Sequence, residues 1–182
     1  MEKIQNNLLE LTQDTYIIYE NTMAILPIYT ETADLHSLVI ERYRVVRVPR
    51  SPKKIIEESC DYYGCSMSGR KQSALTILKG KKMIPILISR MDSLCMVPLC
   101  SPESPNCIWV ANQHVLKISV VQNKTIIHLN NHKKIKVELS RMALEAKLGT
   151  AALLVNTYEL RKKEMADLTK KDMVAEEGKV YG

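Results

Sequence analysis

The amino-acid sequence predicts an α+β protein, with a mainly antiparallel sheet or meander, a short helix near residues 52–61 and a longer C-terminal helix near residues 140–165. Most of the chain before residue 140 consists of short β-branched or apolar runs separated by turn residues, a pattern typical of antiparallel strands. In the middle of the chain these runs do not alternate with helical segments, which argues against a parallel sheet of the Rossmann type. After residue 140 the apolar residues recur every three or four positions, as on one face of a helix.

The length of 182 residues suits one domain that buries a real core. We expect this domain to span residues 1–168, with an N-terminal hairpin, a central basic meander and a C-terminal packing helix. Apolar runs at residues 16–19 and 23–26, separated by a polar triplet, predict the hairpin. The charged residues 169–182 are expected to form a flexible tail.

The region after the hairpin predicts a strand and then a helix. Residues 37–48 form a β-branched run, and on one strand Arg42 and Arg44 would share a face. Ser51 followed by Pro52 is typical of an N-cap residue with proline at the first helical position. The helix that starts there is expected to bury its isoleucines.

Residues 58–72 join this helix to the next predicted strand and end in a cationic pair, Arg70 and Lys71. Gly64 and Gly69 allow tight backbone turns, so we expect a compact corner that presents both cations to phosphate. A surface turn with two solvated cations explains the same residues when the stretch is considered by itself.

The remaining chain predicts a meander and a packing helix. Strands are expected at residues 73–78 and 83–88, joined as a hairpin by the cationic loop 79–82. Further strands are expected at residues 94–99, 114–121, 125–129 and 134–139. The helical stripe that follows is expected to dock on the sheet or on a second copy of the protein. Its members are Leu144, Leu148, Ala151, Val155 and Tyr158.

The charge of the chain favours an anionic partner. A formal charge of +6 and a pI near 9.0 are compatible with nucleic acid or an anionic membrane surface. The cations concentrate in residues 42–54 and 70–90, which predicts one broad positive surface. The first candidates for phosphate or groove contacts are Arg70 and Lys71. The supporting candidates are Arg42, Arg44, Arg47, Arg50, Lys53, Lys54, Lys79, Lys81 and Lys82.

Motifs for catalysis and cofactor binding are absent from the sequence. There is no GxGxxG, Walker or GxSxG motif, so we expect a non-enzymatic protein without a cofactor. Cysteines at 60, 65, 95 and 100 have spacings unlike the usual zinc knuckle, so no metal site is expected. No apolar run reaches the length of a membrane span, and the first seven residues lack the apolar region of a signal peptide, which predicts a cytoplasmic protein.

Several separate motifs resemble the ComK family of bacterial competence transcription factors. They are SCDYYGCSMSGRK at residues 59–71, MIPI at 83–86, Pro98-Leu99, Ser101, PNCIW at 105–109 and His114-Val115. The resemblance covers roughly residues 31–160. Their spacing makes it far more specific than basic charge alone.

The resemblance implies an activator that recognises AT-rich promoter boxes in double-stranded DNA, largely through the minor groove. It also implies self-association on DNA, DNA bending, and degradation delivered by an adaptor and protease machinery. Such a protein would be nucleoid-associated when bound to DNA. The segment that corresponds to the family's C-terminal region is hard to see in residues 169–182, which suggests a shortened or diverged member.

A protein-interaction module is the alternative. In that case the basic surface is incidental, and the C-terminal helix binds a partner or a second copy through Leu144, Leu148, Val155 and Tyr158.

Overall fold

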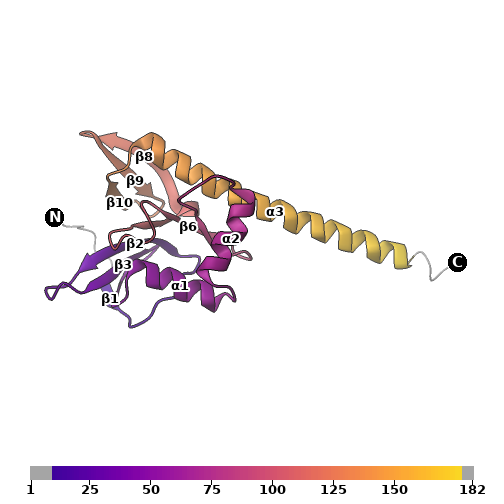
Figure 1. The fold of residues 1–182 in the computed structure, drawn as a ribbon, viewed down its shortest axis with the longest axis horizontal. Helices are drawn as coiled ribbons and strands as arrows, with labels where there is room; N and C mark the ends of the chain where they lie inside the picture. Colours follow the sequence, from indigo (N-terminus) through magenta and orange to yellow (C-terminus); the bar gives the residue numbers. More distant parts are fainter. Residues whose placement is uncertain (1–9, 178–182) are drawn as a thin grey trace.

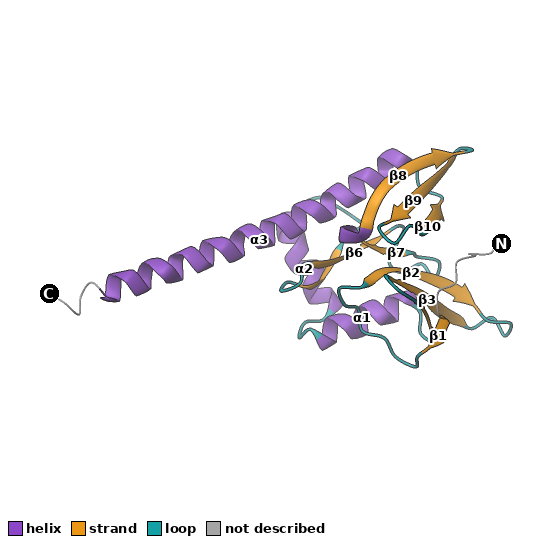
Figure 2. Cartoon of the chain, turned by 180° about the vertical axis from the view of Figure 1, so that it is seen from behind, coloured by secondary structure: helices purple, strands orange, loops and turns teal. Residues whose placement is uncertain are grey.

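The computed structural model describes residues 10–177 and confirms an α+β fold with mostly antiparallel sheets (Figures 1 and 2). A seven-stranded sheet has the order β1-β4-β3-β2-β7-β6-β5, and a three-stranded sheet has the order β10-β9-β8. Neighbouring strands are antiparallel except for the parallel pair β1 and β4.

The strands are β1 (Glu10–Thr12), β2 (Thr22–Tyr29), β3 (Leu35–Glu41), β4 (Val45–Val48), β5 (Ile86–Ser89), β6 (Leu94–Pro98), β7 (Trp109–Ala111), β8 (Val115–Val121), β9 (Lys124–Leu129) and β10 (Lys134–Val137). The helices are α1 (Pro52–Tyr62), α2 (Met67–Ile77), the short 3-10 helix η1 (Asn112–His114) and α3 (Arg141–Glu177).

The seven-stranded sheet is buried on both faces, because successive side chains of a strand point to opposite sides. On one side, Trp109 and Ile25 pack with Ile55 and Ile56 of α1. On the other side, α2, α3 and the three-stranded sheet cover a second cluster. The large sheet is therefore the middle layer of the molecule.

Helix α1 confirms the prediction made from local sequence signals. The Ser51 hydroxyl accepts a hydrogen bond from the Lys54 amide at 3.3 Å, and Pro52 stands at the start of the helix. Ile55, Ile56 and Cys60 are fully buried. A capped start and one apolar face are sufficient to specify this helix.

Helix α3 confirms the predicted C-terminal helix and extends beyond residue 165. Leu144 is fully buried, and Leu148, Val155 and Tyr158 pack against the same core cluster. The apolar face of α3 thus packs against the chain's own sheet, which is one of the two alternatives that the sequence left open. With 37 residues, α3 is about 55 Å long, and its C-terminal half projects beyond the body (Figure 1). The last part of the expected tail, residues 178–182, lies outside the described residues.

The predicted N-terminal hairpin is wrong. Residues 16–19 form no strand, and β2 pairs with β3 instead. Tyr16 and Ile18 are nevertheless buried, and the Ile18 amide donates to the Ser59 hydroxyl of α1 at 3.0 Å. The apolar run therefore marks a buried loop whose backbone is satisfied by a helix side chain rather than by a strand.

The single strand predicted at residues 37–48 is also wrong, since a turn divides it into β3 and β4. The Glu41 amide donates to the Arg44 carbonyl at 3.0 Å and closes the turn. Arg42 and Arg44 consequently lie in this turn and do not share a strand face.

The strand predicted at residues 73–78 is helical and belongs to α2. Ala74 and Leu78, four residues apart, are buried against the core, so the apolar run serves a helix face. Residues 79–82 therefore connect α2 to the strand β5, and the predicted hairpin is wrong. The strands predicted at 94–99, 114–121, 125–129 and 134–139 are confirmed within a few residues at their ends.

Candidate nucleic-acid interface

Arg70 and Lys71 lie in the first turns of α2 and not in the compact corner that was expected between a helix and a strand. The Ser66 hydroxyl caps the helix by accepting from the Gly69 amide at 3.2 Å. A Cβ atom at Gly69 would lie 2.9 Å from the Cys65 sulfur, so this glycine allows the close approach of the preceding chain. Gly64, with φ of +78°, provides the left-handed residue of the turn from α1 to α2.

The Arg70 side chain is tethered and that of Lys71 is exposed. A terminal guanidinium nitrogen of Arg70 donates to the Tyr63 carbonyl at 3.0 Å. Its Nε is buried and has no acceptor among the described residues. Arg70 is thereby held at a fixed position beside α1, while Lys71 is free to follow an approaching phosphate.

The predicted cations at the start of α1 lie beside carboxylates of the same chain. Arg50 and Lys54 each lie 3.8 Å from the Glu58 carboxylate. Lys53 pairs with Glu103, and also lies 3.8 Å from Glu57. A phosphate at these positions would compete with carboxylates, which lowers the positive potential there.

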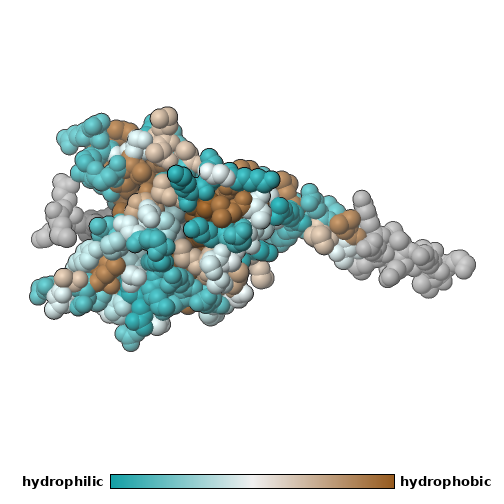
Figure 3. Space-filling model, viewed as in Figure 1, coloured by the Kyte–Doolittle hydropathy of each residue, from teal (hydrophilic) through white to brown (hydrophobic). Residues whose placement is uncertain are grey.

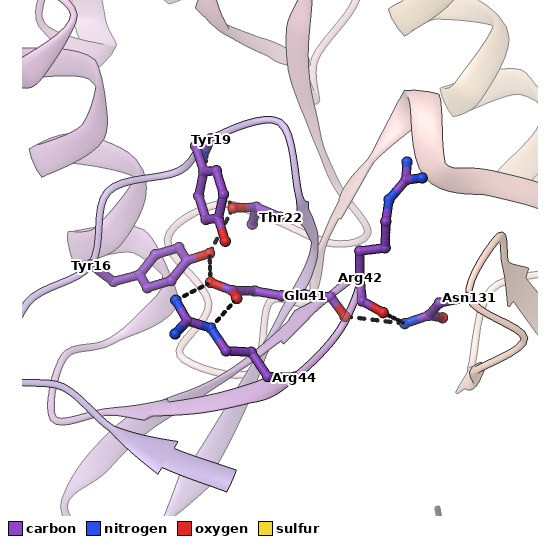
Figure 4. A network of polar contacts seen from close by, with 7 residues as sticks. All are labelled: Tyr16, Tyr19, Thr22, Glu41, Arg42, Arg44 and Asn131. Atoms are coloured by element: carbon purple, nitrogen blue, oxygen red, sulfur yellow. Dashed lines mark hydrogen bonds and ion pairs between the residues drawn. The ribbon is translucent and has the colours of Figure 1, made fainter. Parts of the chain in front are cut away.

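A buried carboxylate organises the turn between β3 and β4 (Figure 4). Glu41 is only 2% exposed; it accepts from the Tyr16 hydroxyl at 2.7 Å and pairs with Arg44. Burial raises the pKa of Tyr16, which keeps this hydroxyl a donor. Hydrogen bonding to Glu41 raises the pKa of Arg44. The Arg44 guanidinium is therefore used in an ion pair within the protein.

Arg42 occupies the outer part of the same turn. Its guanidinium points away from the Glu41 carboxylate (Figure 4), and it forms no ion pair with another described residue. The Asn131 amide donates to the backbone carbonyls of Glu41 at 3.1 Å and Arg42 at 3.5 Å. The turn is thus held in place by the contacts of the Glu41 carboxylate and by the hydrogen bonds of the Asn131 amide.

The loop between α2 and β5 carries exposed lysines without carboxylate partners in the described part of the chain. They are Lys79, Lys81 and Lys82. Arg47 is exposed on β4. The predicted broad positive surface is therefore divided. The cations of α1 and Arg44 form ion pairs within the chain, whereas Arg42, Lys71 and the loop lysines are available to contact phosphate.

Sequence reasoning missed the outer face of the three-stranded sheet. The register places Lys117 of β8 and Lys134 of β10 on either side of His128 of β9. Lys136 lies on the same face, two residues beyond Lys134. Burial, together with the charges of Lys117 and Lys134, lowers the pKa of His128. The alternation of lysine with apolar residues in β10 is the sequence signal that would have indicated this face.

The described residues contain no group of three or more side chains suited to a metal ion. Burial raises the pKa of the Cys60, Cys95 and Cys107 thiols to about 12, so these thiols stay protonated near neutral pH. No helix in the described range is long and apolar enough to cross a membrane.

Comparisons with known proteins give one family match and one similar relative. The family model described as "ComK protein" matches residues 13–163. The competence transcription factor of Bacillus subtilis (strain 168) is 26% identical over 151 residues, which cover 81% of this chain and 77% of that protein. No solved structure matches the chain significantly.

Proposed function

The chain belongs to the ComK protein family, and we propose that it is a DNA-binding transcriptional activator acting in competence for transformation. The observation that carries this function is the family match over residues 13–163, together with the similarity to the competence transcription factor of Bacillus subtilis. No catalytic step is part of the proposal.

Unpaired cations on folded elements support DNA as the partner. Lys71 on α2, Arg42 on the β3–β4 turn and the loop lysines 79–82 have no carboxylate partner among residues 10–177. Binding of such cations to phosphate releases condensed counterions, which drives association. The lysines on the outer face of the small sheet extend this set.

We further propose that readout favours AT-rich boxes through the minor groove. Arg42 stands on a tight turn that Glu41 and Asn131 hold in place. A slender, pre-organised arginine suits a narrow minor groove, and A·T-rich sequence makes the potential in that groove more negative. Self-association on DNA, a cytoplasmic and nucleoid location, and adaptor-delivered proteolysis rest on the family resemblance.

The double substitution Arg70→Ala with Lys71→Ala tests the first candidate contacts. We expect weaker binding to an AT-rich duplex, and a salt dependence of log K that is shallower by up to about 2 if both cations contact phosphate. The measurement is a mobility-shift titration at several salt concentrations.

Lys53→Ala with Lys54→Ala is the matched control, because it removes the same formal charge from cations that already have carboxylate partners. This control should change the salt slope less than the α2 pair. Unchanged affinity and slope in a folded Arg70→Ala, Lys71→Ala protein would exclude these two residues as contacts.

A further inference from the structure

A groove lies where α3 leaves the body of the molecule. Side chains of α2, the β5–β6 turn and α3 line an open hollow of about 520 Å³, within the range of about 300–1,000 Å³ that is usual for ligand sites. A second hollow of about 340 Å³ continues it toward the start of α2 and shares Arg90 and Met91 with it. The lining of the first hollow is Ser73, Thr76, Arg90, Met91, Tyr158, Arg161, Lys162 and Met165.

Two exposed methionines give the α2–α3 groove an apolar, adaptable edge. The side chains of Met91 and Met165 are 85% and 63% exposed, although both line the same hollow. Figure 3 shows apolar residues among hydrophilic ones on the described part of α3 beyond the body. Methionine is flexible and polarizable, so these side chains can adjust to apolar side chains of different shape.

Three cations lie beside these methionines in the lining of the groove. The guanidinium carbons of Arg90 and Arg161 lie 4.8 Å and 5.6 Å from the centre of the Tyr158 ring. Both guanidinium groups are thereby held at the groove by cation–π contact. Lys162 adds a third positive charge to the lining.

Nearby carboxylates do not neutralise these cations. The lining contains no acidic side chain. Asp92 accepts from the Ser89 hydroxyl at 2.7 Å, and Glu159 accepts from the Ser93 hydroxyl at 2.6 Å. Among the residues described, no ion pair involves Arg90, Arg161 or Lys162.

We propose that the α2–α3 groove binds an acidic segment of a partner protein that places large apolar side chains on the exposed methionines and carboxylates against Arg90, Arg161 and Lys162. Charge complementarity selects an anionic occupant, and the exposed methionines select one that also brings apolar surface. A DNA backbone would use the cations but would leave the methionines in contact with charged phosphate. The lining of the first hollow contains none of the cations proposed to contact DNA, although Arg70 lines the adjoining hollow.

Fluorescence anisotropy with three labelled synthetic peptides tests the proposal. The first peptide has leucine at positions i, i+3, i+4 and i+7 and glutamate elsewhere. In the second peptide glutamine replaces glutamate, and in the third serine replaces leucine. We expect the first peptide to bind about tenfold more tightly than either of the others, since both charge and apolar contact contribute.

Two pairs of variants locate the site. Arg161→Glu and Met91→Ser should each weaken binding of the first peptide by about tenfold. Lys163→Glu on the same helix and Met142→Ser, a methionine that is 79% exposed outside the groove, should leave it unchanged. Duplex shift assays on the same variants separate this site from the DNA surface.

Three results would overturn the proposal. They are no binding of the first peptide, equal binding of the three peptides, or equal effects of the groove variants and their controls. Loss of duplex binding in Arg161→Glu without loss of peptide binding would assign the groove to nucleic acid instead. Retained peptide binding in a protein that binds no DNA would support the groove while removing the proposed function.

Discussion

At the scale of single residues, a buried carboxylate decides which basic side chains remain available. Glu41 accepts from Tyr16 and pairs with Arg44 inside the protein. One arginine of the turn is consequently structural, while Arg42 faces outward. The sequence alone could not separate them, because they differ only in the partner that folding brings to each.

We expect Glu41→Gln to destabilise the protein by on the order of 1–2 kcal/mol, because a buried acceptor for Tyr16 and Arg44 is weakened. Arg44 is itself partly exposed, so water moderates the loss. The measurement is the urea midpoint of unfolding. Glu138→Gln is the matched control, since this carboxylate is 81% exposed in its pair with Lys124, and the midpoint should not change. Equal midpoints for all three proteins would show that the buried carboxylate does not stabilise the turn.

At the scale of elements, local sequence signals predicted helix α1, whereas packing against the core made the α2 segment a helix and not a strand. A serine cap, a proline and adjacent isoleucines specify α1 within the sequence itself. In α2 the run from Ser73 to Leu78 fits a strand or a helix equally well, since it is short and apolar. Its helical form follows from the Ser66 cap and from the core that receives Ala74 and Leu78.

His114 joins the two sheets and should make their contact sensitive to pH. Its Nε2 donates to the Glu20 carbonyl at 2.6 Å and its Nδ1 accepts from the Asn130 amide at 3.1 Å, which fits the neutral imidazole. Burial lowers the pKa of His114 from 6.5. The unfolded chain therefore binds the proton more strongly, and stability that is full above about pH 6.5 is lost as the pH falls toward the folded pKa.

Urea unfolding at pH 7.5 and 5.5 checks this expectation. The wild-type midpoint should fall with pH, and His114→Gln should reduce that dependence even if it is less stable at both values. The lowered pKa of His128 has the same sign and is common to both proteins. His132→Asn serves as the control, because this histidine is exposed and has a φ of 66° that asparagine tolerates. A dependence equal in wild type and His114→Gln would refute the role of His114.

At the scale of the whole molecule, folding redistributes a charge that the sequence presents as two continuous runs. The cations of α1 form ion pairs with carboxylates. In the small sheet, Lys117, Lys134 and Lys136 from two strands lie on one face. Composition could predict an anionic partner, and the spaced motifs could predict the family. The register between strands, which places residues distant in sequence side by side, could not be obtained from either.

Competition between duplexes tests the central proposal most directly. A labelled AT-rich duplex bound to the protein is challenged with unlabelled AT-rich and GC-rich duplexes of equal length at one fixed salt concentration. The AT-rich competitor should displace the label at a concentration at least about tenfold lower than the GC-rich competitor. Displacement at equal concentrations would contradict recognition of AT-rich boxes, and absence of any bound duplex at modest salt would contradict DNA binding itself.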